Sequence, residues 1–201
     1  MRLRSVVVIT QPTVEPVSLA EAKRQLSLMP EQTDDDQMIV RMISTARRLV
    51  EKRLGVALAP QQIRARYDQA DGDGWYRGPA GIGRAALELP VSPVMTGGGF
   101  PLVVDVDGVT VSSAAYSVDT DSMPGAVRFS SVPSVSDSAT LTVTYWAGQN
   151  TIAPQLRSAI LLYVGHLYAN REVVTTDGSQ PAEVPLAFDA LLASESISGR
   201  W

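Results

Sequence analysis

Two stretches in the first quarter of the chain carry hydrophobic residues at steps of three and four, which is the spacing of amphipathic helices. The first predicted helix begins with the capping-box spacing of Ser18-Leu-Ala-Glu21 and runs to about Leu28. The second follows the acidic residues 34–36 and runs to about Leu54, with Gly55 where helices commonly stop. On this second helix the residues expected to face the core are Met38, Met42, Ala46, Leu49 and Val50.

A third long helix is predicted from Pro154 to about Glu172. Proline suits the first position of a helix, because the backbone N–H that it lacks would have no helical partner there. The helix carries a stripe at steps of three and four, formed by Leu156, Ile160, Val164, Leu167 and Arg171. A further short helix is predicted over residues 184–192, within the C-terminal segment.

The middle of the chain changes character and predicts short β-strands. Residues 56–149 are rich in Gly, Pro, Ser, Thr and Val, and apolar positions alternate along several runs. Asp107-Gly108 between two valines is a strong signal for a tight hairpin. We expect a small antiparallel sheet or partial barrel, with strands over residues 63–67, 86–89, 102–106, 126–129 and 141–145.

The order of these elements predicts an α+β fold. In it, helices from both ends of the chain form a bundle around a central antiparallel β insertion, and an extended tail follows. We expect an N-terminal extended arm over 1–15, a helical core from 16–55 and 151–174, a β-rich region over 56–150, and a C-terminal tail over 175–201. The short apolar run Val6 to Ile9 is expected to be a strand and not a signal peptide.

Composition limits the possible functions. The 201 residues include 17 basic and 21 acidic ones, a net charge of −4, which argues against a protein that grips nucleic acid by neutralising phosphates. With no cysteine and one histidine, thiolate chemistry is excluded and a histidine-based metal centre is not expected. No window approaches the roughly 20 apolar residues of a membrane span, so no membrane partner is expected.

The candidate chemical motifs do not predict an active site. Asp71-Gly-Asp-Gly74 and Asp105-Val-Asp-Gly108 lack the ligand spacing and closing Glu of an EF-hand, so turns are the better interpretation. Residues 78–83 lack the Gly-Lys-Ser/Thr end of a phosphate-binding loop. His166 has no catalytic partner at motif spacing and is expected to be structural. We therefore expect no catalytic, cofactor-binding or metal-binding residues.

A basic cluster on the second predicted helix leaves two interpretations open. The cluster could be a solvated helix face, with Glu51 among its positive charges, or it could contact a neighbouring acidic subunit or DNA. We expect an intersubunit role for one or two of its arginines. The arginine that ends the third helix could cap the last carbonyls of that helix or pair with a neighbouring subunit. The candidate intersubunit residues are Arg47, Arg48, Arg53 and Arg171, with Lys52 completing the cluster.

Several blocks together resemble the head–tail connector (adaptor) proteins of tailed bacteriophages. They are residues 16–26 with Ser18-Leu-Ala-Glu-Ala-Lys23, residues 36–55, Leu89-Pro-Val-Ser-Pro-Val94, and Tyr145-Trp-Ala-Gly148 with the helix after it, which ends in Tyr168-Ala-Asn-Arg-Glu172. Each block alone is weak, but their order and spacing are fairly specific. The chain is most similar to the longer branch of this family, found in prophages and in gene transfer agents.

The resemblance implies a structural protein and not an enzyme. Such a connector forms a homo-oligomeric ring, typically a dodecamer, beneath the portal protein in the neck of a virion or phage-like particle assembled in the bacterial cytoplasm. The ring extends the DNA channel, lets DNA pass without sequence-specific binding, and offers a platform to a downstream stopper or tail protein. The alternative is an accessory β-rich binding module or small enzyme encoded in a phage operon.

The resemblance also implies that the C-terminal tail engages the portal. The tail carries apolar residues but too little chain for a core of its own, so it either packs on its own domain or becomes ordered on a partner. We expect the second, because aromatic anchors are common at binding hot spots. The candidate portal-docking residues are Phe188, Leu191, Leu192, Ile197 and Trp201.

Overall fold

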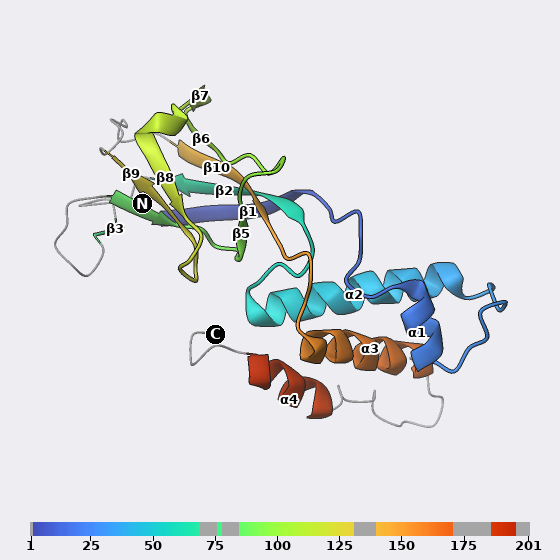
Figure 1. Ribbon diagram of the computed structural model, residues 1–201. Helices are drawn as coiled ribbons and strands as arrows, with labels where there is room; N and C mark the ends of the chain where they lie inside the picture. Colours follow the sequence, from blue (N-terminus) through green and yellow to red (C-terminus); the bar gives the residue numbers. More distant parts are fainter. Residues whose placement is uncertain (1, 69–75, 78–84, 131–139, 171–185, 196–201) are drawn as a thin grey trace. The chain divides into compact units, whose positions relative to one another are not determined.

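The chain has the expected α+β composition, with four α-helices and antiparallel sheets among the residues that the structure describes (Figure 1). The computed structural model describes residues 2–68, 76–77, 85–130, 140–170 and 186–195. Contacts divide the chain into two compact units, one of Met1–Thr13 with Ala59–Gln149 and one of Val14–Leu58 with Asn150–Trp201. The first unit carries the strands and the second carries the α-helices.

One antiparallel sheet of the first unit contains the N-terminal segment. Its strand order is β1 (Arg2–Thr10), β2 (Gln61–Asp68), β10 (Thr140–Ala147), β6 (Val103–Val106) and β7 (Val109–Thr110), and β5 (Val94–Met95) also pairs with β10. The expectation of a separate N-terminal arm needs correction here. Residues 2–10 form a strand of this sheet because their backbone pairs with β2 along nearly its whole length.

A second antiparallel sheet has the order β3 (Tyr76–Arg77), β4 (Ala85–Glu88), β9 (Ala126–Phe129) and β8 (Tyr116–Asp119). A short 3₁₀ turn, η1 (Ser113–Ala115), precedes β8. The Tyr67 hydroxyl on β2 donates to the carbonyl of Glu88 on β4 at 2.7 Å, which links the two sheets. Burial raises the pKa of Tyr67, so the phenol stays a donor.

Alternation along the two central strands places one face of the first sheet in the core. On β2 the residues Ile63, Ala65 and Tyr67 are buried, and β10 alternates in the same way from Leu141 to Ala147. The buried Tyr145 hydroxyl accepts from the backbone N–H of Val91 at 3.0 Å, and burial raises its pKa. The polar residues between these positions face away from the core.

The tight hairpin at Asp107-Gly108 is confirmed. It joins β6 to β7, and its two residues have φ of 49° and 82°, the left-handed conformations that a type I′ turn requires. The Asp107 carboxylate accepts from the backbone N–H of Thr140 at 2.9 Å, and Asp105 accepts from the Thr110 hydroxyl at 2.7 Å. These carboxylates therefore hold a turn together, as the sequence indicates.

The second unit contains α1 (Leu19–Gln25), α2 (Asp36–Leu54), α3 (Pro154–Ala169) and α4 (Leu186–Glu195). Their apolar faces share one core. The capping box is confirmed, because Ser18 accepts from the Glu21 N–H and Glu21 accepts from the Ser18 N–H. Gly55 ends α2 with φ 65°, as expected, and Pro154 occupies the first turn of α3.

Three expectations about the helices were wrong in detail. On α2 Ala46 and Val50 are buried as expected, but Ile39 and Ile43 are buried in place of Met38 and Met42, so the buried stripe is shifted by one residue in the first half of the helix. On α3 Leu167 is half-buried and does not belong to the core. Helix α1 ends before Leu28, because Ser27 takes φ 57° and the N–H of Leu28 bonds back to the Lys23 carbonyl, a Schellman ending.

Candidate interaction surfaces

Arg47, a candidate intersubunit residue, is buried within its own subunit. Its side chain is 2% exposed, its Nε lies 2.7 Å from Glu15 Oε2, and its Nη1 lies 2.6 Å from Glu51 Oε2. Glu51 also accepts from the backbone N–H of Leu58 at 2.9 Å. Burial raises the pKa of Glu51, although the positive charge of Arg47 opposes this. The guanidinium is therefore fully used inside the fold, and the expectation of an intersubunit role for Arg47 needs correction.

The other members of the basic cluster lie on the outside of α2. Arg48, Lys52 and Arg53 are exposed, so α2 presents a positive strip along one side. Arg53 Nη1 lies 2.8 Å from Asp189 Oδ1 on α4, in a pair whose side chains are about half exposed. The side chains of Arg48 and Arg53 thus lie at the surface of α2, and Arg171 lies outside the described residues.

The candidate docking residues on α4 pack on their own subunit. Phe188 is fully buried, Leu192 is 6% exposed, and Leu191 is half-buried against the same core. The Phe188 ring lies 5.3 Å from the Tyr163 ring on α3. The expectation that these residues become ordered only on the portal was therefore wrong for Phe188 and Leu192. Their steps of three and four, read as a helical stripe, were the signal for burial. Ile197 and Trp201 lie outside the described residues.

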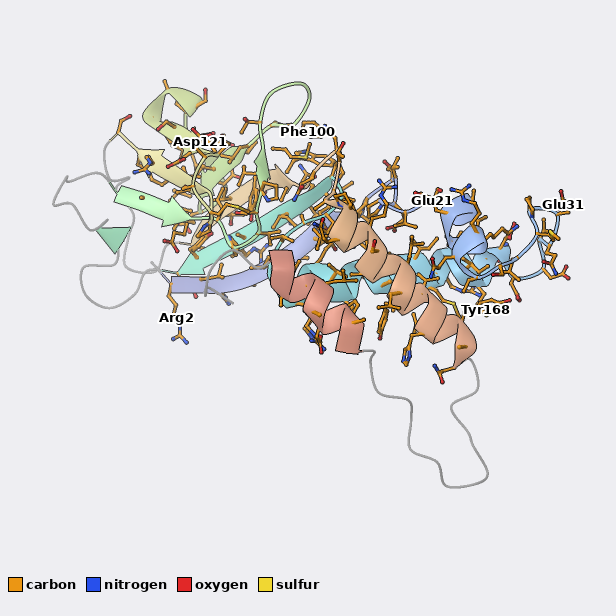
Figure 2. The ribbon with its side chains drawn as sticks, turned by 60° about the horizontal axis from the view of Figure 1, so that its bottom comes forward. Arg2, Glu21, Glu31, Phe100, Asp121 and Tyr168 are labelled. Atoms are coloured by element: carbon orange, nitrogen blue, oxygen red, sulfur yellow. The ribbon has the colours of Figure 1, made fainter. Side chains whose placement is uncertain are left out.

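A network of charged contacts fixes α1 and the start of α2 to α3. Arg157 Nη1 on α3 lies 2.6 Å from Glu21 Oε1, and the Tyr168 hydroxyl donates to Asp35 at 2.6 Å (Figure 2). Hydrogen bonds from Ser18 are the main reason that the pKa of Glu21 falls to about 2, and Arg157 adds to it. The almost buried Lys23 lies 2.6 Å from Asp36. These contacts are structural, because they set where the helices meet.

The face of the first sheet that points away from the core forms a shallow charged groove of about 430 Å³. Arginines at one side, threonines along β10 and aspartates by the β6–β7 turn line it, namely Arg4, Arg64, Arg66, Thr140, Thr142, Thr144, Asp105 and Asp107, with Gly108. Both aspartates accept hydrogen bonds from within the sheet. The groove offers guanidinium and hydroxyl donors to an anionic surface.

An apolar surface lies on β1. Leu3, Val6, Val7, Val8 and Ile9 are each between 36% and 52% exposed. At the start of the strand, the Arg2 side chain extends away from the ribbon (Figure 2). The sequence predicted this segment as a strand but gave no sign that it would be exposed, because an uninterrupted apolar run is typical of a strand buried on both faces.

The described residues hold no arrangement that suggests catalysis. His166 is half-buried, stacks on Tyr163 with ring centroids 5.8 Å apart, and contacts Asn170, which fits a structural role. Among these residues no group of three His, Cys, Asp or Glu side chains could hold a metal ion. No helix in the same part of the chain is long and apolar enough to cross a membrane. Residues 71–74 and 78–83 lie outside the described residues, whereas Tyr76 and Arg77, which lie between these two ranges, are described.

Solved structures similar to this chain come from the necks of phage-like particles. One is a chain of the neck of an empty gene transfer agent particle computed with C6 symmetry, with 19% identity, a TM-score of 0.72, and 98% of this chain and 100% of that chain covered. The chain has the fold of a gene transfer agent neck protein. A chain of the neck of the native particle, computed with C12 symmetry, has 16% identity and a TM-score of 0.69, with 98% and 100% covered.

A chain of the virion of the native gene transfer agent particle is also similar, with 20% identity, a TM-score of 0.68, and 98% and 97% of the two chains covered. No protein-family model matches the sequence, and no curated protein sequence matches it significantly. The resemblance indicated by the sequence blocks is thus confirmed at the level of the fold. It extends over both units of the chain.

Proposed function

We propose that the protein is a head–tail connector (adaptor) of a tailed phage or a phage-like particle. It assembles as a ring beneath the portal, extends the DNA channel and joins the head to the tail. The observation that carries this proposal is the likeness to gene transfer agent neck chains, which covers 98% of this chain and 100% of those chains.

The symmetry of those neck structures supports a ring of identical copies. They are computed with C6 and C12 symmetry, so equivalent chains are related by rotation about one axis. We propose a dodecamer for this protein. In a cyclic ring each subunit contacts its neighbours through two different surfaces, so the interface is heterologous. The exposed Arg48 and Arg53 on α2, and Arg171, are the charged residues that we propose for it.

The proposed mechanism is binding without catalysis. The portal binds one side of the ring and a stopper or tail protein binds the other, in the particle neck, after assembly in the bacterial cytoplasm. The net charge of −4 suits a channel through which DNA slides without sequence-specific contacts. Because Phe188 and Leu192 are buried in the subunit, we propose that portal docking by the tail relies on Ile197 and Trp201.

Deletion of the gene distinguishes this proposal from an accessory binding module or a small enzyme. Loss of a connector leaves DNA-filled heads without tails, whereas loss of an accessory protein leaves whole particles. Electron micrographs of the particles give the count of tailed and tailless heads. Averaged images of the neck then test the location, since the connector predicts density of this chain between portal and tail. Complete particles from the deletion strain contradict the proposal.

A further inference from the structure

Strand β1 is the end strand of its sheet and presents a long open edge. Its Arg2–Thr10 backbone pairs with β2 on one side, and among the described residues no strand pairs with it on the other. Such an edge carries a row of backbone donors and acceptors that can pair with another chain. The opposite end of the sheet is β7, which has two residues. The sheet is therefore open mainly at β1.

The apolar inner layer of the sheet continues onto β1 but is uncovered there. Val6 and Val8 pair in register with Ala65 and Ile63, so each pair lies on the same face of the sheet. Ala65 and Ile63 are 0% and 1% exposed, whereas Val6 and Val8 are 40% and 36% exposed. On the other face, beside the arginines of the charged groove, Val7 lies opposite Arg64 and is 52% exposed. β1 thus exposes apolar side chains on both faces, Val6 and Val8 on one and Val7 on the other.

The sequence of β1 is that of a strand covered on both sides. Strands buried on both faces have uninterrupted apolar runs, and Val6-Val-Val-Ile9 is such a run. Proteins protect exposed edges with charges, proline or bulges. The register shifts of β1 fall between Leu3 and Ser5 and between Val8 and Thr10, and its charges are Arg2 and Arg4. The regular stretch Ser5–Val8 has no such protection.

We propose that β1 is a subunit–subunit surface, on which an extended segment of the neighbouring copy pairs with the open edge and covers Val6, Val7 and Val8. This inference rests on the proposed ring. A cyclic ring places a second copy beside every subunit and requires two different surfaces to meet. Addition of a strand to an open edge supplies backbone hydrogen bonds, and the exposed valines supply apolar area. The second copy thus buries the backbone edge of β1 and the valines that a single subunit leaves exposed.

A photo-crosslinking amino acid identifies the occupant of this edge. We place p-benzoylphenylalanine at Val7 in the full-length chain, in assembled particles, and at Val40 on α2 as the control, because Val40 is similarly exposed at 46%. Irradiation of the Val7 variant is expected to give a band of twice the chain's mass, at least fivefold stronger than that of the Val40 variant. Mass spectrometry is expected to find two peptides of this chain in that band.

Other outcomes overturn the inference in distinguishable ways. A crosslink from Val7 to the portal or to another particle protein, or no more crosslinking than from Val40, removes the role of β1 but leaves the connector function intact. Absence of the chain from the neck removes both. A second variant, Val7→Glu, tests the contribution of the apolar surface. It places a carboxylate at a half-exposed position opposite Arg64, where we expect the isolated subunit to tolerate it. It is expected to lower the fraction of ring-bound chain at least tenfold at an unchanged melting temperature, whereas Val40→Glu does not.

Discussion

The ring of Phe188 on α4 lies 5.3 Å from the ring of Tyr163 on α3, and Phe188 has no exposed surface. This contact makes α4 a part of the folded subunit. The Arg53–Asp189 pair also joins α2 to α4, but both side chains are about half exposed, and such pairs contribute at most about 1 kcal/mol. Burial of Phe188 and Leu192 is therefore the main interaction that holds α4 in place.

Truncation of Phe188 to alanine is expected to destabilise the protein by about 3–5 kcal/mol, the range for removing a fully buried aromatic side chain. Urea unfolding followed by circular dichroism measures the loss. Ala190→Ser, at an exposed position of the same helix, is the control and is expected to change stability by less than about 0.5 kcal/mol. Equal stability of the two variants contradicts the packing of α4 on its own subunit.

Gly148 and Gly165 are expected to respond to alanine in opposite directions. Gly148 has φ 144°, and a Cβ there would lie 2.5 Å from the carbonyl oxygen of Ala59, so Gly148→Ala should cost about 1–3 kcal/mol. Gly165 lies within α3 with no atom within 4 Å of an added Cβ. Because alanine favours helix, Gly165→Ala should stabilise by about 0.5–1 kcal/mol. Thermal melts give the change in melting temperature of each variant relative to the parent. Changes of the same sign in both variants contradict this prediction.

Local signals in the sequence identified the ends of the helices and the tight turn. Ser18 with Glu21, Gly55, Pro154 and Asp107-Gly108 each act within a few residues, so their roles follow from neighbours in the chain. The Tyr145-to-Gly148 block was recognised by resemblance, and the close approach of Ala59 to Gly148 is the physical reason for glycine there. That contact joins residues far apart in sequence, so it could not be predicted from spacing.

Long-range contacts explain what the sequence analysis missed. One partner of Arg47, Glu51, lies four residues away and could be expected, but Glu15 lies 32 residues away, and burial needs both. Ile39 and Ile43 are buried where the methionines were expected to be, because the position of α3 determines which side of α2 faces the core. The short strand β8, over Tyr116–Asp119, has too few alternating positions to be recognised without its partner β9.

Replacement of Arg47 by methionine is expected to destabilise the protein by about 3–5 kcal/mol, because it leaves the carboxylates of Glu15 and Glu51 without their cation in a largely buried site. Lys52→Met on the exposed side of α2 is the control, with a change under about 0.5 kcal/mol. Denaturant unfolding at neutral pH measures both. If Arg47→Met folds as stably as the parent but fails to form rings, Arg47 is an intersubunit residue after all.

Glu21 is expected to make stability depend on pH in the acid range. Its pKa in the folded protein is about 2, below the ordinary value of 4.5, so the folded state favours the carboxylate. The stabilisation is complete above pH 4.5 and is lost as the pH falls from there toward 2. Glutamine can still accept the Ser18 N–H of the capping box, but the charge that Ser18 and Arg157 stabilise is lost. Glu21→Gln should therefore lower stability at neutral pH by about 0.5–1.5 kcal/mol.

The difference between Glu21→Gln and the parent is expected to shrink as the pH falls through that window, because the parent then loses the same interaction. Unfolding curves at several pH values between neutral and acid measure this convergence. Glu31→Gln, which changes an exposed carboxylate in the loop before α2 (Figure 2), is the control and should run parallel to the parent at every pH. A constant difference for Glu21→Gln across the range contradicts the role of its charge.

Two truncations are expected to separate the folding role of the C-terminal region from its proposed docking role. A chain that ends after Glu195 keeps α4 with Phe188 and Leu192, so its melting temperature should stay within about 2 °C of the parent, because a change under 0.5 kcal/mol shifts a domain of this size by no more than that. It lacks Ile197 and Trp201, so stable attachment to the portal should be abolished.

A chain that ends at residue 185 lacks α4 and should be strongly destabilised, because the core of the second unit loses Phe188 and Leu192. Melting curves and co-sedimentation with portal-bearing heads measure the two effects. If the chain that ends after Glu195 still joins heads to tails at the normal rate, the docking surface lies elsewhere on the subunit.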